Sequence, residues 1–205
     1  MGELPHWQQP NGNALISECE PTESIVEAFR VLRHGIHFLR RDARVFICTS
    51  STPGQGKTFV STNIAVALAM TGKRVLLVDG DIRRRTLSCK FRSTAGLTGI
   101  LIEEDDAPIS LAENVVVDAI YKGVDLLPSG IQPPNPAELL MSERLEKFVD
   151  VARASYDYII FDATPAFAVA DAEILSRVSD LMLYIIRVGV QDRNFLPDLE
   201  KFHKS

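Results

Sequence analysis

The sequence predicts an α/β protein built on a doubly wound, mostly parallel β-sheet flanked by helices. Short, uniformly apolar runs, typical of strands buried on both faces, alternate with helical segments along most of the chain. The 205 residues, 46% hydrophobic and 24% charged, are ordinary for one soluble globular domain. We expect this domain to cover residues 21–205. Residues 1–20, in which prolines and glycines break any periodicity, are predicted to be an arm or linker.

The first predicted helix begins at Ser24, which forms a capping-box pattern with Glu27 three residues later. Apolar side chains that we expect to face the core then recur at helical spacing: Ile25, Phe29, Leu32, Ile36 and Leu39. A separate polar face carries Glu27, Arg30 and Arg33, because side chains three residues apart are neighbours on a helix.

The remaining elements are predicted to alternate. Apolar runs predict strands at 45–49, 75–78, 123–127, 158–161 and 181–188. Helices are expected at 57–70, around 97–102, at 135–154, at 171–178 and at the end of the chain. Asn135 and Pro136 are a typical cap and first helical residue for the helix at 135–154.

Composition excludes several classes of protein. The net charge of −5 argues against a general nucleic-acid-binding surface. The sequence has no run of 18 apolar residues and no secretory signal. The three cysteines lack metal-ligand spacing, so we interpret them as reduced thiols of a protein that works in or faces the cytosol.

The strongest chemical signal is Ser51-Thr52-Pro53-Gly54-Gln55-Gly56-Lys57-Thr58, between a predicted strand and a predicted helix. It fits the P-loop pattern except that serine replaces the first glycine. Small residues let backbone N–H groups approach phosphates, and the helix N-terminus adds a favourable dipole. Lys57 should reach the β- and γ-phosphates, and the Thr58 hydroxyl should ligate Mg²⁺. The predicted nucleotide-binding residues are Thr52, Pro53, Gly54, Gln55, Gly56, Lys57, Thr58 and Phe59.

Carboxylates follow two other predicted strands. Asp79 and Asp81 come after residues 75–78, and Asp162 follows residues 158–161 in the manner of a Walker B strand. Ligands of open α/β sheets bind at the carboxyl edge of the strands. Carboxylates gathered there repel one another unless a cation lies between them, and Mg²⁺ bound to ATP supplies that cation. The sequence therefore predicts a P-loop NTPase fold with a magnesium site formed by Thr58, Asp79, Asp81 and Asp162.

The nucleotide is predicted to be ATP, because the Asn-Lys-x-Asp pattern that reads guanine in GTPases is absent from the sequence. Thr52 stands where the partitioning and division-site ATPases of the deviant P-loop group carry an additional lysine. This substitution argues against a simple member of that group.

These motifs resemble those of the bacterial tyrosine kinases (BY-kinases) that control capsule and exopolysaccharide export. That family combines a P-loop, three apolar residues followed by Asp-x-Asp-x-Arg, and a Walker B strand ending in Asp-x-x-Pro. The second motif is found here at 76–83 and the third at 159–165, and the proline-rich segment 130–140 is similar to a family loop and its following helix. The resemblance extends from about Pro21 to the end of the chain.

The resemblance implies an ATP-dependent, autophosphorylating tyrosine kinase in which Lys57, Asp79 and Asp81 are catalytic. Asp81 is the candidate acceptor of the tyrosine proton. Glu27, Arg30 and Arg33 match the Glu-x-x-Arg-x-x-Arg motif through which family members assemble into rings. Arg83 either pairs, with acids in the site or with a neighbouring subunit, or is a plain surface arginine. Arg84 and Arg85 extend it into a basic cluster that is more often solvated.

Family members usually end in a tail of clustered tyrosines that a neighbouring subunit phosphorylates, and they contact adenine near a final strand. This chain ends without either feature, so we expect a truncated domain. Its own tyrosines are expected to be core or edge residues and poor phosphate acceptors: Tyr121, Tyr156, Tyr158 and Tyr184.

The segment Gly2-Glu3-Leu4-Pro5 resembles the linker after the second membrane helix of members fused to their activator. This resemblance implies a location on the cytoplasmic face of the bacterial inner membrane. The implied partners are neighbouring subunits, a transmembrane polysaccharide co-polymerase and a tyrosine phosphatase.

Two other functions share the same phosphate-binding residues. One is an ATPase of the partitioning type, whose hydrolysis drives assembly without a protein substrate. The other is a nucleotide sensor without enzymatic activity that regulates an export channel through ring assembly. The presence of Lys57, Asp79, Asp81 and Asp162 together argues against the sensor.

Overall fold

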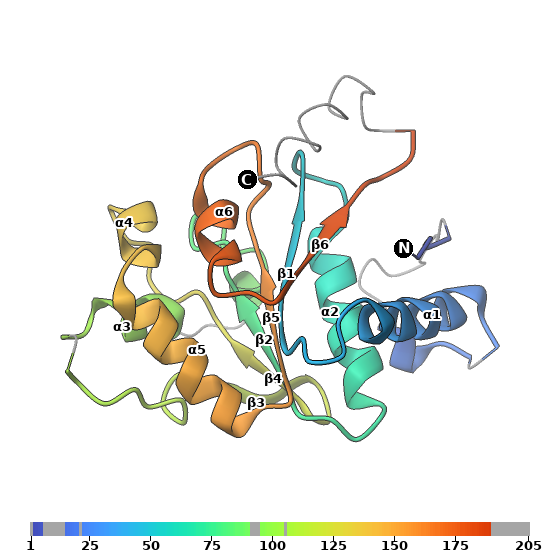
Figure 1. Cartoon of the computed structure of the whole chain (residues 1–205), viewed down its shortest axis with the longest axis horizontal. Coiled ribbons are helices and arrows are strands. Elements are labelled where there is room, and N and C mark those ends of the chain that lie inside the picture. Colours follow the sequence, from blue (N-terminus) through green and yellow to red (C-terminus); the bar gives the residue numbers. More distant parts are fainter. Residues whose placement is uncertain (1, 6–14, 21, 91–94, 105, 190–205) are drawn as a thin grey trace.

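A computed structural model describes residues 2–5, 15–20, 22–90, 95–104 and 106–189 of the chain (Figure 1). Its centre is a six-stranded sheet in the order β3-β4-β2-β5-β1-β6. The strands are β1 (Val45–Ser50), β2 (Val75–Asp79), β3 (Val116–Tyr121), β4 (Val124–Leu127), β5 (Tyr158–Asp162) and β6 (Leu181–Ile185).

All neighbouring strands pair in parallel, except the antiparallel pair β3 and β4 at one edge. The order places β5 between β1 and β2, so apart from β3 and β4 the strands that follow each other in the sequence are separated in the sheet. Parallel strands of this kind need crossover connections over the faces of the sheet. The predicted doubly wound α/β fold is confirmed.

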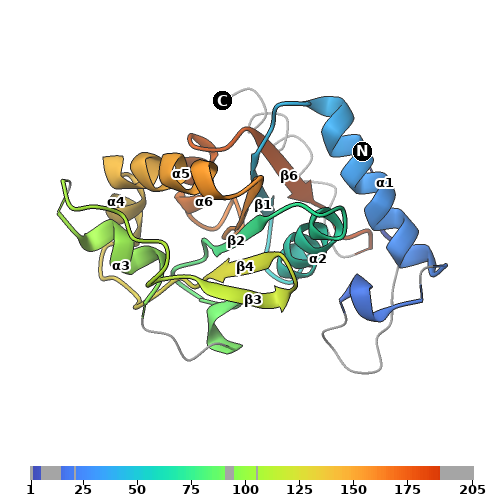
Figure 2. The same cartoon turned by 90° about the horizontal axis from the view of Figure 1, so that it is seen from below.

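The helices are α1 (Ser24–Leu39), α2 (Lys57–Ala69), α3 (Leu97–Ile102), α4 (Pro136–Leu140), α5 (Glu143–Ser155) and α6 (Asp171–Ser176). Two 3₁₀ turns lie at Ile16–Glu18 and Ser88–Lys90. Figure 2 shows α1 and α2 on one side of the sheet and α5 and α6 on the other.

The alternation of side chains along a strand divides the core into two layers. In β1, Phe46 and Cys48 join the cluster beneath α1 and α2, whereas Val45 and Ile47 join the cluster beneath the other helices. β1, β2 and β4 are buried along their whole length, as we expect of strands covered on both faces.

Several local predictions were wrong. Helix α1 is preceded by Glu23 as its cap instead of Ser24, and the Glu23 carboxylate accepts the Glu20 N–H at 3.0 Å. Leu39, predicted to face the core, is exposed. The single helix expected at 135–154 is divided into α4 and α5, because the chain leaves α4 after Leu140 and Ser142 caps a new helix. Strand β3 was not predicted.

The predicted arm is not wholly outside the core. Ile16 is buried, and its N–H donates to Asn63 Oδ1 on α2 at 2.8 Å. A domain boundary at residue 21 remains a prediction. The helix predicted at the chain end lies outside the described residues, and among those described no helix is long and apolar enough to cross a membrane.

Candidate nucleotide-binding site

The P-loop connects the carboxyl end of β1 to the first turn of α2, as predicted. Gly54 and Gly56 have φ angles of 80° and 95°, a left-handed conformation that glycine adopts without steric cost. Gly56 is the cap residue of α2 and has no side chain to bond the first N–H groups of the helix. Those amides remain available to an anion, which is the arrangement that binds phosphate.

Side chains hold the loop in this shape. Gln55 donates from Nε2 to Thr52 Oγ1 at 2.9 Å and accepts the Arg187 N–H at 2.8 Å. Ser50 donates from Oγ to the Thr52 carbonyl at 2.7 Å. The segment after β6 is therefore bonded to the loop, a contact that no local sequence pattern had indicated.

Thr58 and Asp162 join the P-loop to the Walker B strand. The Thr58 hydroxyl donates to Asp162 Oδ2 at 2.6 Å, although the two residues are 104 positions apart. Strand β5 lies directly beside β1, so its last residue reaches the start of α2. A hydroxyl and a carboxylate in contact at this place are the pair that holds Mg²⁺ in P-loop proteins.

Asp79 lies beside Asp162, because these residues are register partners at the ends of β2 and β5. Asp79 Oδ2 accepts the Ser88 N–H at 2.8 Å and the Ser88 hydroxyl at 2.5 Å. Ser129 donates in turn to Ser88 Oγ from its own N–H at 2.7 Å. Ser88 and Ser129, which fix Asp79 from outside the predicted motifs, had no recognisable sequence signal.

Both carboxylates have one oxygen bonded and one unpaired. Asp79 Oδ1 and Asp162 Oδ1 are buried and have no hydrogen-bond partner among the described residues. An unsatisfied buried oxygen is costly unless a cation or water binds it. The donor set therefore fits Mg²⁺, with Thr58 and Asp162 as the best-placed ligands and Asp79 beside them.

Burial controls the electrostatics of the site. Burial and, to a smaller extent, the neighbouring Asp79 charge raise the pKa of Asp162 to about 7, although the Thr58 hydrogen bond opposes the shift. Burial likewise raises the pKa of Asp79 to about 6, although the Ser88 hydrogen bonds oppose this. Burial lowers the pKa of Lys57, while the Asp162 and Asp81 carboxylates act in the opposite direction. The lysine and all three acids thus lie close enough for their charges to interact.

Asp81 is 5% exposed and lies in the loop after β2, where its Oδ1 accepts the Arg84 N–H at 2.9 Å. Arg83 makes two parallel bonds to Asp171 on α6, from Nε at 2.7 Å and from Nη2 at 3.0 Å. Asp171 is fully buried, so of the two interpretations of Arg83 the structure supports pairing with an acid. Arg84 bonds Asp81 through its backbone N–H, and its own side chain is exposed, as expected of a solvated basic cluster.

The side chains of the remaining predicted residues make their contacts outside the P-loop. Phe59 packs its ring against Phe29 of α1 at 5.8 Å between centroids, so its side chain contributes to the core between α1 and α2. Glu27 and Arg30 form an ion pair at 3.1 Å, and Arg33 donates to the Ala67 carbonyl of α2 at 2.7 Å. These bonds lie within one chain, and the role of the three residues in assembly stays a prediction.

The acids alone do not form a complete metal cage: within the described ranges, no group of three or more His, Cys, Asp or Glu side chains could hold a metal ion. Mg²⁺ usually retains waters and binds one or two protein ligands together with phosphate oxygens. The arrangement is therefore suited to a magnesium–nucleotide complex and poorly suited to an isolated metal ion.

A family model described as an AAA domain matches residues 44–194. The tyrosine-protein kinase YwqD of Bacillus subtilis (strain 168) is 38% identical over 183 residues, which are 87% of this chain and 75% of YwqD. The putative tyrosine-protein kinase EpsB of Ralstonia solanacearum is 37% identical over 180 residues, and these span 86% of this chain but 23% of EpsB.

Among solved structures, the kinase domain of the Escherichia coli tyrosine kinase ETK is similar, with a TM-score of 0.83 and 29% identity. The match covers 97% of this chain and 78% of that domain. It therefore includes the strands that carry the phosphate loop and both acidic motifs. This chain belongs to the family of bacterial tyrosine kinases.

Proposed function

We propose that this chain is the ATP-dependent kinase domain of a protein-tyrosine kinase that regulates capsular or exopolysaccharide synthesis and export. The observation that carries the proposal is the meeting of the P-loop with Asp162 and Asp79 at one sheet edge. YwqD and EpsB, two similar proteins, are named as tyrosine kinases.

The residues would divide the work as follows. Bound Mg²⁺ would neutralise charge on the β- and γ-phosphates of ATP. Thr58 and Asp162 would hold it, and the amides around Gly54 and Gly56 would bind the phosphates. Lys57 would place its ammonium group against the transferred phosphoryl group, and its proximity to Asp162 and Asp81 would stabilise its charged form.

Asp81 is the proposed acceptor of the tyrosine proton. One of its oxygens is bonded to the Arg84 N–H, which leaves the other for the incoming hydroxyl. Phosphoryl transfer has a loose transition state, so positioning and charge neutralisation supply most of the catalysis. A tyrosine with a pKa near ~10 therefore need not ionise before the reaction.

The decisive experiment incubates the domain with labelled ATP, Mg²⁺ and a tyrosine-rich peptide and measures phosphotyrosine. Transfer is expected for the natural sequence and a loss of at least about a hundredfold for Lys57→Met or Asp81→Ala. Matched controls are the exposed Lys122→Met and Asp150→Ala, which should leave transfer unchanged. Label that appears only as free phosphate would favour an ATPase of the partitioning type instead.

The proposed assembly is a ring of identical subunits, with Glu27, Arg30 and Arg33 at the contact. In the parent protein, a fused or associated transmembrane co-polymerase would place the domain at the cytoplasmic face of the inner membrane. A tyrosine phosphatase would reverse the modification. Alanine at all three positions should convert rings to monomers in sedimentation, whereas an unchanged size would show that this face is merely solvated.

A further inference from the structure

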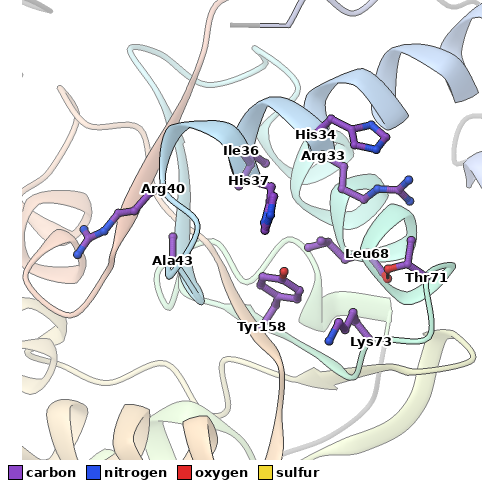
Figure 3. Close-up of a pocket in the computed structure, with 10 residues that line it drawn as sticks. All are labelled: Arg33, His34, Ile36, His37, Arg40, Ala43, Leu68, Thr71, Lys73 and Tyr158. Atoms are coloured by element: carbon purple, nitrogen blue, oxygen red, sulfur yellow. Dashed lines mark hydrogen bonds between the residues drawn. The ribbon is translucent and has the colours of Figure 1, made fainter.

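A pocket of about 170 Å³ lies at the end of the sheet opposite the P-loop (Figure 3). It is bordered by the C-terminal half of α1, the C-terminal end of α2 and the first residue of β5, Tyr158. Ala43 before β1 and Lys73 before β2 complete it. These positions are at the amino ends of the strands, so the pocket is separate from the nucleotide site.

Among the described residues, the lining carries basic side chains and no carboxylate. The basic residues are Arg33, His34, His37, Arg40 and Lys73. Two acids outside the lining pair with part of this charge: Asp157 accepts from Lys73 Nζ at 3.2 Å, and Asp42 lies 3.5 Å from Arg40 Nε. Arg40 points away from Tyr158 in Figure 3, so the permanent charges near the pocket are those of Arg33 and Lys73 against the Asp157 carboxylate, and this positive balance favours an anion.

The basic side chains retain donors for a ligand. Arg33 uses Nη1 to bond the Ala67 carbonyl and Lys73 uses one N–H to bond Asp157, whereas guanidinium offers five donors and ammonium three. The bond of Arg33 to the Ala67 carbonyl is explained without a ligand, because cations are stabilised near the C-terminal ends of helices such as α1 and α2. The helix ends do not explain the positions of Lys73 and His37, whose side chains approach Tyr158 from different sides in Figure 3.

The same pocket has an aromatic and apolar wall. The Tyr158 ring is tilted against Phe46 at 5.6 Å between centroids, which fixes its position. Ile36 and Leu68 contribute aliphatic surface. A flat aromatic group could pack on this wall while its anionic end reaches the basic residues and the Tyr158 hydroxyl.

The volume limits the occupant to one small group. Pockets for nucleotide-sized or drug-sized ligands usually measure ~300 Å³ or more. A buried water takes about 30 Å³, so this pocket holds a few waters or one substituted ring. An extended sugar chain or a second nucleotide does not fit, but one side chain of a peptide does.

We propose that this pocket binds an aryl phosphate, namely the side chain of a phosphotyrosine presented by a peptide. The proposal rests on the proposed function, because a phosphotyrosine is the product of that reaction. The phosphate would accept hydrogen bonds from Lys73 and His37, and the ring would pack between Leu68 and Tyr158. The domain would thereby bind a phosphorylated segment at the end of the sheet opposite the P-loop, away from the site at which the tyrosine is phosphorylated.

Binding of synthetic peptides to the whole chain tests the proposal without relying on kinase activity. A peptide with one phosphotyrosine is titrated in the presence of saturating Mg-ADP, which blocks the P-loop, and heat is measured by calorimetry. We expect a Kd below about 1 mM and no detectable binding of the unmodified peptide. The phosphoserine peptide and inorganic phosphate should bind at least tenfold more weakly, because they lack the ring.

Single substitutions test whether the phosphotyrosine peptide binds in this pocket. Lys73→Ala and His37→Ala should each lower the affinity for the phosphotyrosine peptide about tenfold, whereas Lys122→Ala and Lys57→Met should leave it unchanged. Circular dichroism of each variant establishes that it is folded. The proposal is overturned if phosphotyrosine does not bind, if phosphoserine or phosphate binds equally well, or if Lys73→Ala leaves the affinity unchanged. A loss of kinase activity in Lys57→Met without loss of peptide binding separates the two functions.

Discussion

Asp79 and Asp162 are register partners at the carboxyl ends of β2 and β5, and within the described part of the chain each has one bonded and one unpaired carboxylate oxygen. Ser88 bonds the first acid and Thr58 the second. Adjacent buried carboxylates repel each other, and this repulsion contributes to the raised pKa of Asp162. A bound cation would remove the repulsion and satisfy the unpaired oxygens, so this pair is the basis of the proposed magnesium binding.

Replacement of Asp162 by asparagine should separate metal binding from stability. The amide is neutral, so the metal-free variant should unfold at about the same temperature as the natural protein or slightly higher. Mg-ATP should raise the melting temperature of the natural protein, because a ligand that binds only the folded state stabilises it. It should raise that of Asp162→Asn far less. If Mg-ATP raises the melting temperature of Asp162→Asn as much as that of the natural protein, Asp162 is not a ligand of the metal. The exposed Asp150→Asn is the control.

Two glycines allow the conformation of the P-loop to be tested against a matched control. Gly56 and Gly72 have φ angles of 95° and 81°, and a Cβ at either position would meet no atom within 4 Å. Alanine at either position should therefore lower the free energy of unfolding by roughly 1–2 kcal/mol through backbone strain. Only Gly56→Ala should also weaken ATP binding, as measured by calorimetry. Similar affinities in the two variants would mean that the loop tolerates another shape.

The Arg83–Asp171 pair should stabilise the fold through specific geometry. Removal of Arg83 leaves a fully buried carboxylate without its cation, so Arg83→Ala should cost about 3–5 kcal/mol in the free energy of unfolding. Lysine should not restore the loss, since it cannot make two parallel bonds. The double variant Arg83→Met with Asp171→Leu should recover much of the stability in urea denaturation. If Arg83→Ala costs less than about 1 kcal/mol, the pair is only incidental.

The loss of stability at low pH should depend on Asp180. Burial raises the pKa of this carboxyl, but hydrogen bonds from Arg153 and from the Arg44 and Val45 amides outweigh it and hold the pKa below its usual value. A depressed pKa stabilises the protein at neutral pH, and the contribution is lost as pH falls below about 4.

Asp180→Asn should therefore lower the free energy of unfolding by about 1–3 kcal/mol at pH 7 and by less near pH 3. Urea denaturation at both pH values measures the difference. A constant difference between the two values would show that the charge of Asp180 does not matter. The exposed Asp150→Asn controls for loss of a carboxylate.

The sequence could predict the phosphate loop and the acids because each follows a buried strand in a local pattern. It could not predict that Ser88 holds Asp79, since this contact depends on how the irregular chain after β2 folds back. The register of Asp79 with Asp162 likewise depends on β5 entering the sheet between β1 and β2, a tertiary arrangement that no local periodicity encodes.

The errors in secondary structure have similar causes. Strand β3 pairs antiparallel at the edge and is only partly covered, so its residues lack the uniform apolar character of the central strands. The break between α4 and α5 occurs within a stretch of good helix formers. It falls at Ser142, the N-cap of α5, and the second helix is held by tertiary contacts such as the bond from the buried Arg144 to the Ile100 carbonyl at 2.7 Å.

The most direct test of the nucleotide site is ATP affinity measured by calorimetry with Mg²⁺ and with a chelator, in the natural protein and in Thr58→Val. Thr62→Val on the same helix is the matched control. We expect Mg²⁺ to increase the affinity of the natural protein and of Thr62→Val at least tenfold, and to have little effect on Thr58→Val. The same ATP affinity with and without Mg²⁺ in the natural protein would contradict a site built from Thr58, Asp162 and the phosphate loop.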